Sequence, residues 1–197
     1  VNWLKANQPD IWAKTEKFIF LSGYLTHKLT GEFVDSIGSQ VGYIPFDYKR
    51  LTWEESWDVK WQVAPVEPHK LPHLVAPSEQ MGTLSASAAQ ALGLTQGLPV
   101  IAAAADKACE VLGAGCTRND QACLSFGTSA TINVTHSKYV EPQKFVPPFP
   151  AALKKHYTSE VQIYRGFWMV SWFKQEFAHL ERQQATVLGI AVEQQLD

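Results

Sequence analysis

An aspartate that follows an apolar run is the residue with the clearest chemical potential. Residues 98–105 (LPVIAAAA) are uniformly apolar, and Asp106 comes directly after them. The run predicts a strand buried on both faces, and ligands of open α/β sheets bind outside the ends of such strands. A partly desolvated carboxylate placed there could accept a hydroxyl proton as a general base. The alternative is that Asp106 caps the helix that begins at Lys107.

A turn of small residues, Gly127-Thr128-Ser129, is the second candidate. Residues 122–126 and 130–134 flank it and predict the two strands of a hairpin. The backbone N–H groups and hydroxyls of such a turn are suited to holding phosphate oxygens. The alternative is an ordinary hairpin turn. No GxxxxGK[ST] pattern occurs in the chain, so a Walker-type phosphate loop is excluded.

Cysteine and histidine residues show no spacing typical of a metal site or a disulfide framework. Cys109, Cys116 and Cys123 are odd in number and form no CxxC pair, so we expect small buried thiols. The histidines are scattered and are expected at the surface or in satisfied core positions: His27, His69, His73, His136, His156 and His179.

Taken in chain order, these segments resemble the FGGY family of carbohydrate kinases. That family shows G-x-P-V, an apolar strand ending in the catalytic Asp, a G-A-G turn and S-x-G-T-S. The matching segments here are residues 97–108, 112–115 and 124–130. Upstream, residues 25–32 (LTHKLTGE) are similar to the L-x-x-x-L-T-G-E helix end of the family.

Further elements of the family pattern lie between these segments. The family has a D-x-x-x-S-x-x-G-x-x-x-F-D segment followed by a Trp, and here these positions are Asp35, Ser39, Gly42, Phe46, Asp47 and Trp53. It also has an L-P element and a G-x-L element, which Leu71-Pro72 and residues 82–84 match. The resemblance covers about residues 1–135 and is thin from residue 136 onward.

The resemblance implies an α/β chain with an actin-like ATPase (ribonuclease-H-like) architecture, incomplete at both ends. Residues 1–118 would form the C-terminal part of the first, substrate domain, including the strand that leads to the catalytic Asp. Residues 119–197 would form the N-terminal part of the second, nucleotide-binding domain. The D-x-G-T hairpin and the adenine-binding region of the family are not found in the sequence, so we expect an internal fragment that is inactive alone.

The same resemblance implies roles for individual residues. Asp106 matches the catalytic base, and Gly127, Thr128 and Ser129 match the loop that binds the ATP phosphates. Lys107 falls where the family places a residue near the substrate, usually Gln, Asn or Ala. A cation there could indicate an acidic substrate or lost activity, or it could be a surface lysine on a helix.

The implied activity is ATP-dependent phosphorylation of a sugar, sugar alcohol or related small carbohydrate, with ATP and Mg²⁺ as cofactors and no metal ligand assigned within this chain. A non-catalytic regulatory relative on the same fold is one alternative, and another actin-like ATPase is a second. A cytoplasmic location is expected, and a homodimer is compatible with the family.

Composition agrees with a metabolic enzyme. The chain is 46% apolar and 12% aromatic, which suffices for a packed core, and its formal charge is −2 with a pI near 6.3. No global field therefore attracts it to nucleic acid or to an anionic membrane, and no apolar run approaches the ~18 residues of a spanning helix.

The elements that would position these residues follow from periodicity and turn signals. Helices are predicted over 12–30, from Leu51, over 85–93 and over 108–112, with proline-rich connectors at 64–77 and 139–150 and a strand edge leading into an aromatic-rich helix over 161–181. The aromatic cluster of that last segment is expected to be core packing, with an exposed ring for sugar stacking as the alternative: Phe167, Trp168, Trp172 and Phe173.

Overall fold

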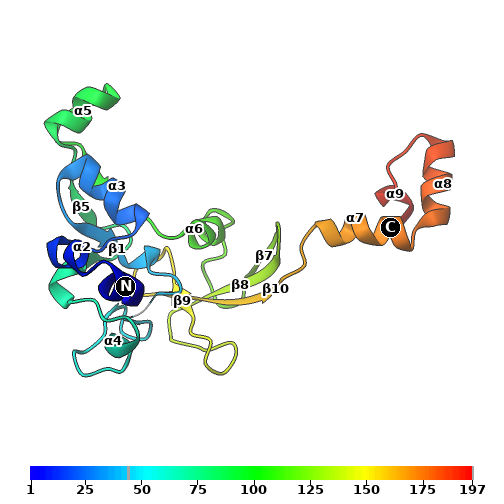
Figure 1. Ribbon diagram of the computed structural model, residues 1–197. Helices are drawn as coiled ribbons and strands as arrows, with labels where there is room; N and C mark the ends of the chain where they lie inside the picture. Colours follow the sequence, from blue (N-terminus) through cyan, green and yellow to red (C-terminus); the bar gives the residue numbers. More distant parts are fainter. Residues whose placement is uncertain (44, 197) are drawn as a thin grey trace. The chain divides into compact units, whose positions relative to one another are not determined.

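A computed structural model describes residues 1–43 and 45–196, which divide into two compact units. Unit 1 comprises Val1–Gln121 and Val134–Ser159, and unit 2 comprises Ala122–Asn133 and Glu160–Asp197. The ribbon of Figure 1 labels the helices and strands of both units. The chain crosses between the two units three times, and two of these crossings fall within the strands over 130–136 and 157–163.

The first helices of unit 1 are α1 (Asn2–Asn7), α2 (Pro9–Lys14) and α3 (Leu21–Thr30). The predicted single helix over 12–30 is therefore wrong between α2 and α3. Thr15 is extended there, and the Phe18 N–H donates to the carbonyl oxygen of Lys70 at 2.8 Å. A partner far along the chain thus interrupts the helical pattern. Gly31, with φ 84°, ends α3 as predicted.

Two short ladders lie beneath α3. Strand β1 (Val34–Ser36) pairs in parallel with β4 (His73–Val75), and β5 (Gln80–Thr83) pairs antiparallel with β6 (Pro99–Ile101). Helix α3 packs on β1 and β5 (Figure 1). These contacts place the polar end of β1 close to the segment that follows β6.

Strand β6 differs from the predicted buried strand over 98–105. It ends at Ile101, whose side chain is 49% exposed. Because β6 is paired only with β5 in a two-stranded ladder, its outer side chains lack a covering layer within the described residues. The prediction of burial on both faces is therefore wrong, as is the predicted length.

The segment after β1 contains a 3-10 turn, η1 (Ile37–Ser39), and a short hairpin of β2 (Phe46–Asp47) with β3 (Thr52–Trp53). The helix predicted from Leu51 is wrong. The Asp47 carboxylate accepts the N–H groups of Lys49 and Arg50 at 2.8 and 2.9 Å, which stabilises a turn, and Leu51 itself is left-handed at φ 57°. The next helix along the chain is the single turn α4 (Lys60–Val63).

The connector over 64–77 is confirmed as irregular apart from η2 (Pro68–Lys70) and β4. Its residues Val66 and Leu71 form a buried core cluster with Trp12 of α2. Lys5 and the indole N–H of Trp12 both bind the Glu67 carboxylate, and although burial acts in the other direction these hydrogen bonds lower the pKa of Glu67 to about 2. The connector is thereby fixed against α1 and α2.

The capped helix predicted over 85–93 is confirmed as α5 (Ala86–Leu92), and the one over 108–112 lies within α6 (Asp106–Gly113). Ser85 accepts the Ala88 N–H at 3.2 Å, and Gly93 ends α5 in the left-handed region. The local capping signals were sufficient for α5.

The hairpin predicted over 122–134 is confirmed as β7 (Ala122–Phe126) and β8 (Ala130–His136). Strand β8 neighbours β10 (Tyr157–Ile163), and β10 pairs antiparallel with β9 (Phe149–Pro150), the only regular element within the predicted connector over 139–150.

Unit 2 continues with α7 (Trp168–Glu176), α8 (His179–Leu188) and α9 (Glu193–Leu196). A strand followed by an aromatic-rich helix is confirmed, but core packing of its aromatic residues is wrong. Phe167, Trp168, Trp172 and Phe173 are 45–60% exposed, and α7 contains no buried residue. Within unit 2 the Trp172 ring meets the Phe177 ring edge-on at 5.3 Å between centroids, and the Phe173 ring stacks on Phe177 at 5.6 Å.

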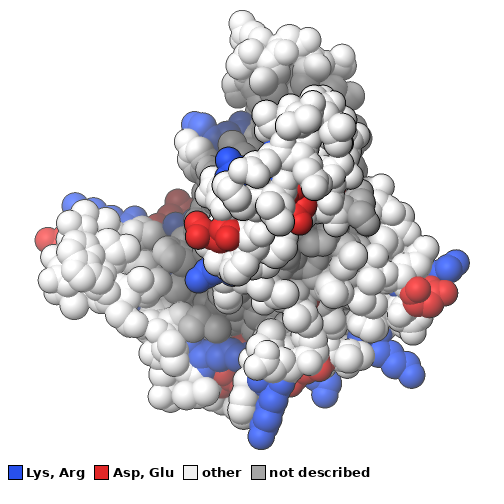
Figure 2. Space-filling view, turned by 90° about the vertical axis from the view of Figure 1, so that its right-hand side faces the viewer, with Lys and Arg blue, Asp and Glu red and all other residues white. Residues whose placement is uncertain are grey.

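Charged side chains are interspersed with uncharged ones on the face drawn in Figure 2. Several charged residues of the described chain form ion pairs, such as Lys5 with Glu67 at 2.8 Å. Among the described residues, no helix has both the length and the apolar character needed to cross a bilayer.

Candidate active site

Asp106 is the first residue of α6. Ala105 is the N-cap residue and provides no side-chain cap, while the Lys107 N–H donates to the Asp106 Oδ1 at 2.7 Å. The negative charge in the first turn complements the positive end of the helix dipole. The side chain of Asp106 is exposed, so the expected partial desolvation of its carboxylate is wrong for this chain. The capping alternative is wrong about the position, because the N-cap residue is Ala105 and Asp106 is the first residue of the helix.

The segment between β6 and Asp106 is held by its backbone. Ala102 donates to the carbonyl of Glu79 and accepts the Ser78 N–H, both at 2.8 Å. The carbonyl of Ala105 accepts the Cys109 N–H at 3.0 Å, and the Cys109 thiol approaches the carbonyl of Ala104 at 3.4 Å. The backbone is therefore bonded on both sides of Asp106, which limits how far its Cα can move.

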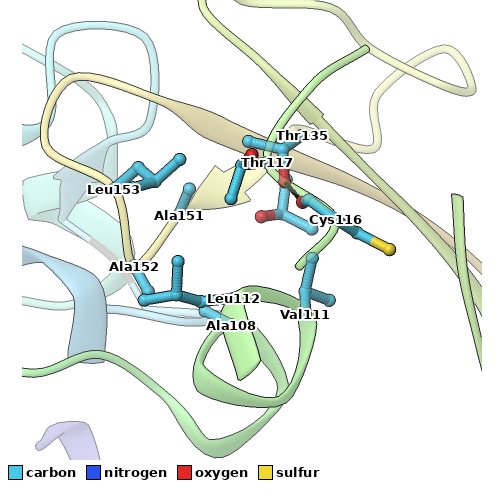
Figure 3. A pocket seen from close by; sticks show the side chains of 10 residues that line it. Ala108, Val111, Leu112, Cys116, Thr117, Thr135, Ala151, Ala152 and Leu153 are labelled. Carbon is cyan, nitrogen blue, oxygen red and sulfur yellow. Dashed lines mark hydrogen bonds between the residues drawn. The ribbon is translucent and has the colours of Figure 1, made fainter. Parts of the chain in front are cut away.

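Helix α6 packs through its apolar face against residues 151–153. Ala108, Val111 and Leu112 point toward Ala151 and Leu153 across a pocket of about 10 Å³ (Figure 3). That volume holds no more than about one water molecule. The pocket is thus a packing seam that fixes the helix rather than a substrate site.

Lys107 forms an ion pair with Glu110 one turn along α6. Its Nζ lies 2.6 Å from the Glu110 Oε2, and the two side chains are 32% and 44% exposed. Such an i,i+3 pair is what a surface lysine on a helix makes, so the geometry is compatible with that reading of Lys107.

The Gly127-Thr128-Ser129 turn closes the β7–β8 hairpin in unit 2. The Gly127 N–H donates to the carbonyl of Ser129 at 2.9 Å, and Gln162 of β10 donates to the Ser129 hydroxyl at 2.9 Å. Gly127 and Thr128 are exposed. Within the described chain the Thr128 N–H and hydroxyl make no hydrogen bond, so both remain available to a phosphate oxygen.

Gly166 fixes this turn from the junction between β10 and α7. The Phe167 N–H donates to the carbonyl of Gly127 at 3.0 Å. A Cβ at residue 166 would lie 1.9 Å from the Gly127 oxygen and 2.6 Å from the Thr128 carbonyl carbon, so only glycine fits. Gly166 is not among the site residues expected from the sequence, although a glycine just before the N-cap of a helix could have suggested a close backbone approach.

The cysteine and histidine expectations are met in part. The three cysteines are thiols, but only Cys123 is buried, while Cys116 is half-buried and Cys109 is exposed. All six histidines are half-buried or exposed. The described residues contain no group of three or more His, Cys, Asp or Glu side chains that could hold a metal ion.

Asp106 lies in unit 1 and the Gly127-Thr128-Ser129 turn lies in unit 2. The structure describes each within its own unit, so that the two groups face one shared crevice stays a prediction.

Comparison with known proteins identifies the family. The sequence model for the N-terminal domain of the FGGY family of carbohydrate kinases matches residues 1–113. An uncharacterized sugar kinase from Escherichia coli (strain K12) is 33% identical over 154 residues, which are 78% of this chain and 31% of that protein. An L-fuculokinase from the same strain is 35% identical over 126 residues, 64% of this chain and 26% of the enzyme.

The fold is shared with solved sugar kinases of the actin-like ATPase class. The xylulose kinase from Rhodospirillum rubrum superimposes with a TM-score of 0.77 at 23% identity, covering 89% of this chain and 35% of that one. The chain spans about a third of the length of the proteins it matches. By sequence and by fold, the chain belongs to the FGGY family of carbohydrate kinases.

Proposed function

We propose that the full-length protein containing this chain phosphorylates a sugar, sugar alcohol or related small carbohydrate with ATP. Membership of the FGGY family is the observation that carries the proposal. The exposed carboxylate at the start of α6 and the exposed turn between β7 and β8 support it, since one can take up a proton and the other can hold phosphate.

In this proposal Asp106 accepts the proton of the attacking hydroxyl. An exposed carboxylate on a bonded backbone can meet a substrate without rearrangement of the helix that carries it. Phosphoryl transfer depends mainly on positioning and on stabilisation of charge. The base is then one contributor, which should be worth ~10²–10⁴-fold in rate.

Gly127, Thr128 and Ser129 are proposed to bind the ATP phosphates. The turn fits an anion because the Thr128 N–H and hydroxyl have no partner within the described chain and no acidic side chain belongs to the turn. Mg²⁺ bound to the nucleotide would neutralise charge on the phosphate oxygens. Mg²⁺ is commonly held by phosphates, waters and one or two carboxylates.

Lys107 is proposed, on weaker support, to lie near the substrate. Its ion pair with Glu110 would have to open for its ammonium group to meet an acidic substrate. We retain residues 1–118 as the substrate-domain part and residues 119–197 as the nucleotide-domain part of the whole enzyme, which we place in the cytoplasm. A homodimer remains compatible with this assignment.

A substrate panel on the full-length protein tests the proposal. Xylulose, fuculose, other sugars, polyols and sugar acids would each be offered with ATP and Mg²⁺, and both ADP release and phosphorylated product would be measured. We expect one class to raise ADP release with stoichiometric product. The 197-residue chain, tested in parallel, should phosphorylate nothing.

The alternatives give different results in the same assay. ATP hydrolysis that no carbohydrate changes would favour another actin-like ATPase. Carbohydrate binding without turnover would favour a regulatory relative. Robust carbohydrate-stimulated turnover by the 197-residue chain would show that the proposed domain boundaries are wrong.

A further inference from the structure

The segment that leads into Asp106 rests on a turn from a distant part of unit 1. The Ser36 hydroxyl, at the end of β1, donates to the carbonyl of Ala103 at 2.5 Å. The carbonyl of Gly38, in η1, accepts the Ala105 N–H at 2.9 Å. These two hydrogen bonds hold the backbone of Ala105, directly before Asp106, and of Ala103.

Gly38 also contacts Ala104 at backbone distance. A Cβ at position 38 would lie 2.6 Å from the Ala104 Cβ, 2.9 Å from its Cα and 3.1 Å from the Ala103 oxygen. The φ of Gly38 is not in the left-handed region, so space and not backbone conformation demands the glycine. Any larger residue must therefore displace Ala104, which is two residues from Asp106.

A buried polar cluster around Asp35 in turn holds η1 in place. Asp35 is 1% exposed and accepts the Ser22 hydroxyl at 2.8 Å, the Ser36 N–H at 2.7 Å and the Gln40 side-chain amide at 3.4 Å. Burial raises the pKa of Asp35, and these hydrogen bonds act against the rise. The Ser36 oxygen additionally accepts the Gly38 N–H at 3.0 Å. The hydroxyl of Ser36 therefore both shapes η1 and holds Ala103.

We propose that Ser36 and Gly38 are positioning residues that set the place of Asp106 through the backbone of Ala103–Ala105. The inference rests on the proposed function, since it assumes that Asp106 is the base. Neither residue needs to touch the substrate. They act by holding residues 103–105, which lead into the first turn of α6.

The expected effect lies in the rate of the chemical step. Misplacement of a catalytic group by about 1 Å can cost ~10²-fold in rate. Gly38→Ala forces a shift of this order in Ala104, so we expect kcat to fall by about 10²-fold. The KM for the carbohydrate should change little, because the substrate contacts are not part of this turn.

A double-mutant cycle in the full-length protein tests the inference. Gly38→Ala and Asp106→Asn would be made singly and together, and kcat and both KM values would be measured well below the melting temperature. Gly113→Ala, at the other end of α6 with open space around its Cβ, is the matched control and should keep the wild-type kcat.

The cycle separates positioning from general destabilisation. If Gly38 acts through Asp106, Gly38→Ala should lower kcat in the wild-type background and cause little further loss in the Asp106→Asn background. Removing the Ala104 Cβ with Gly38→Ala/Ala104→Gly should restore part of the rate. An equal loss in both backgrounds, or a wild-type kcat for Gly38→Ala, would overturn the inference.

A second variant covers the case in which Gly38→Ala does not fold. Ser36→Ala removes the bond to Ala103 without adding volume, and in the same cycle it should again lower kcat only while Asp106 is present. A wild-type kcat for Ser36→Ala would then refute the positioning role. If Asp106→Asn itself keeps the wild-type kcat, the proposed base is wrong, which is a separate failure.

Discussion

At the scale of single residues, the chemistry of the candidate site depends on which polar groups are exposed and which are already bonded. Asp106 and the Gly127-Thr128-Ser129 turn could be selected as candidate site residues from the sequence, because the order of the motifs along the chain points to them. The exposure of Asp106 could not be predicted, since it depends on how far β6 extends. Gly38 and Gly166 were also missed, because a close approach between distant backbones leaves no local signal.

Thr128 carries a prediction at this scale. Thr128→Val keeps the size and shape of the side chain and removes a hydroxyl that has no partner within the described chain. In the full-length protein the KM for ATP should rise more than the KM for the carbohydrate, because only a phosphate hydrogen bond is lost. The melting temperature should stay within a few degrees of the wild type.

Thr186→Val, at an exposed position on α8, is the control for this change. It should leave both KM values unaltered. Equal effects of the two substitutions on the KM for ATP would argue against a phosphate contact at Thr128.

At the scale of elements, local capping signals delimited α5 correctly, but the helices predicted over 12–30 and from Leu51 were overridden by contacts outside those patterns. Ser85 and Gly93 were enough to delimit α5. The break between α2 and α3 depends on the carbonyl of Lys70, and the turn before β3 depends on the side chain of Asp47. Neither contact is visible in the periodicity of the segment that it changes.

The junction of β10 and α7 carries the prediction at this scale. Gly166→Ala places a Cβ in contact with the backbone of Gly127 and Thr128, so the turn must move. Overpacking of this kind costs about 1–3 kcal/mol. We expect the melting temperature to fall by several degrees and the KM for ATP to rise. Thermal melts and initial rates at varied ATP would measure both.

Gly113→Ala serves again for comparison, because nothing lies within 4 Å of a Cβ at that position. A Gly166→Ala variant that melts like Gly113→Ala and binds ATP normally would show that the turn is not held from this junction.

At the scale of the whole molecule, the two candidate groups lie in different units, and the chain spans about a third of the length of its relatives. The family and the fold class followed from motif order across residues 1–135, and the comparisons confirm both. The exposed aromatic residues of α7 could not be predicted, because burial depends on the size of the unit around them. The proposed phosphoryl transfer requires the base and the phosphate loop to act on one substrate pair, so the predicted effects apply to the full-length protein.

Asp106 is proposed as the base of that reaction, and the measurement that bears on this role is the kcat of Asp106→Asn in the full-length protein. The amide is nearly isosteric, and its oxygen can still accept the Lys107 N–H that now binds Oδ1. General-base assistance is worth ~10²–10⁴-fold, so kcat should fall by that factor while the carbohydrate KM and the melting temperature stay near wild type. A near-normal kcat combined with a much lower melting temperature would contradict the claim, because Asp106 would then serve only the start of α6.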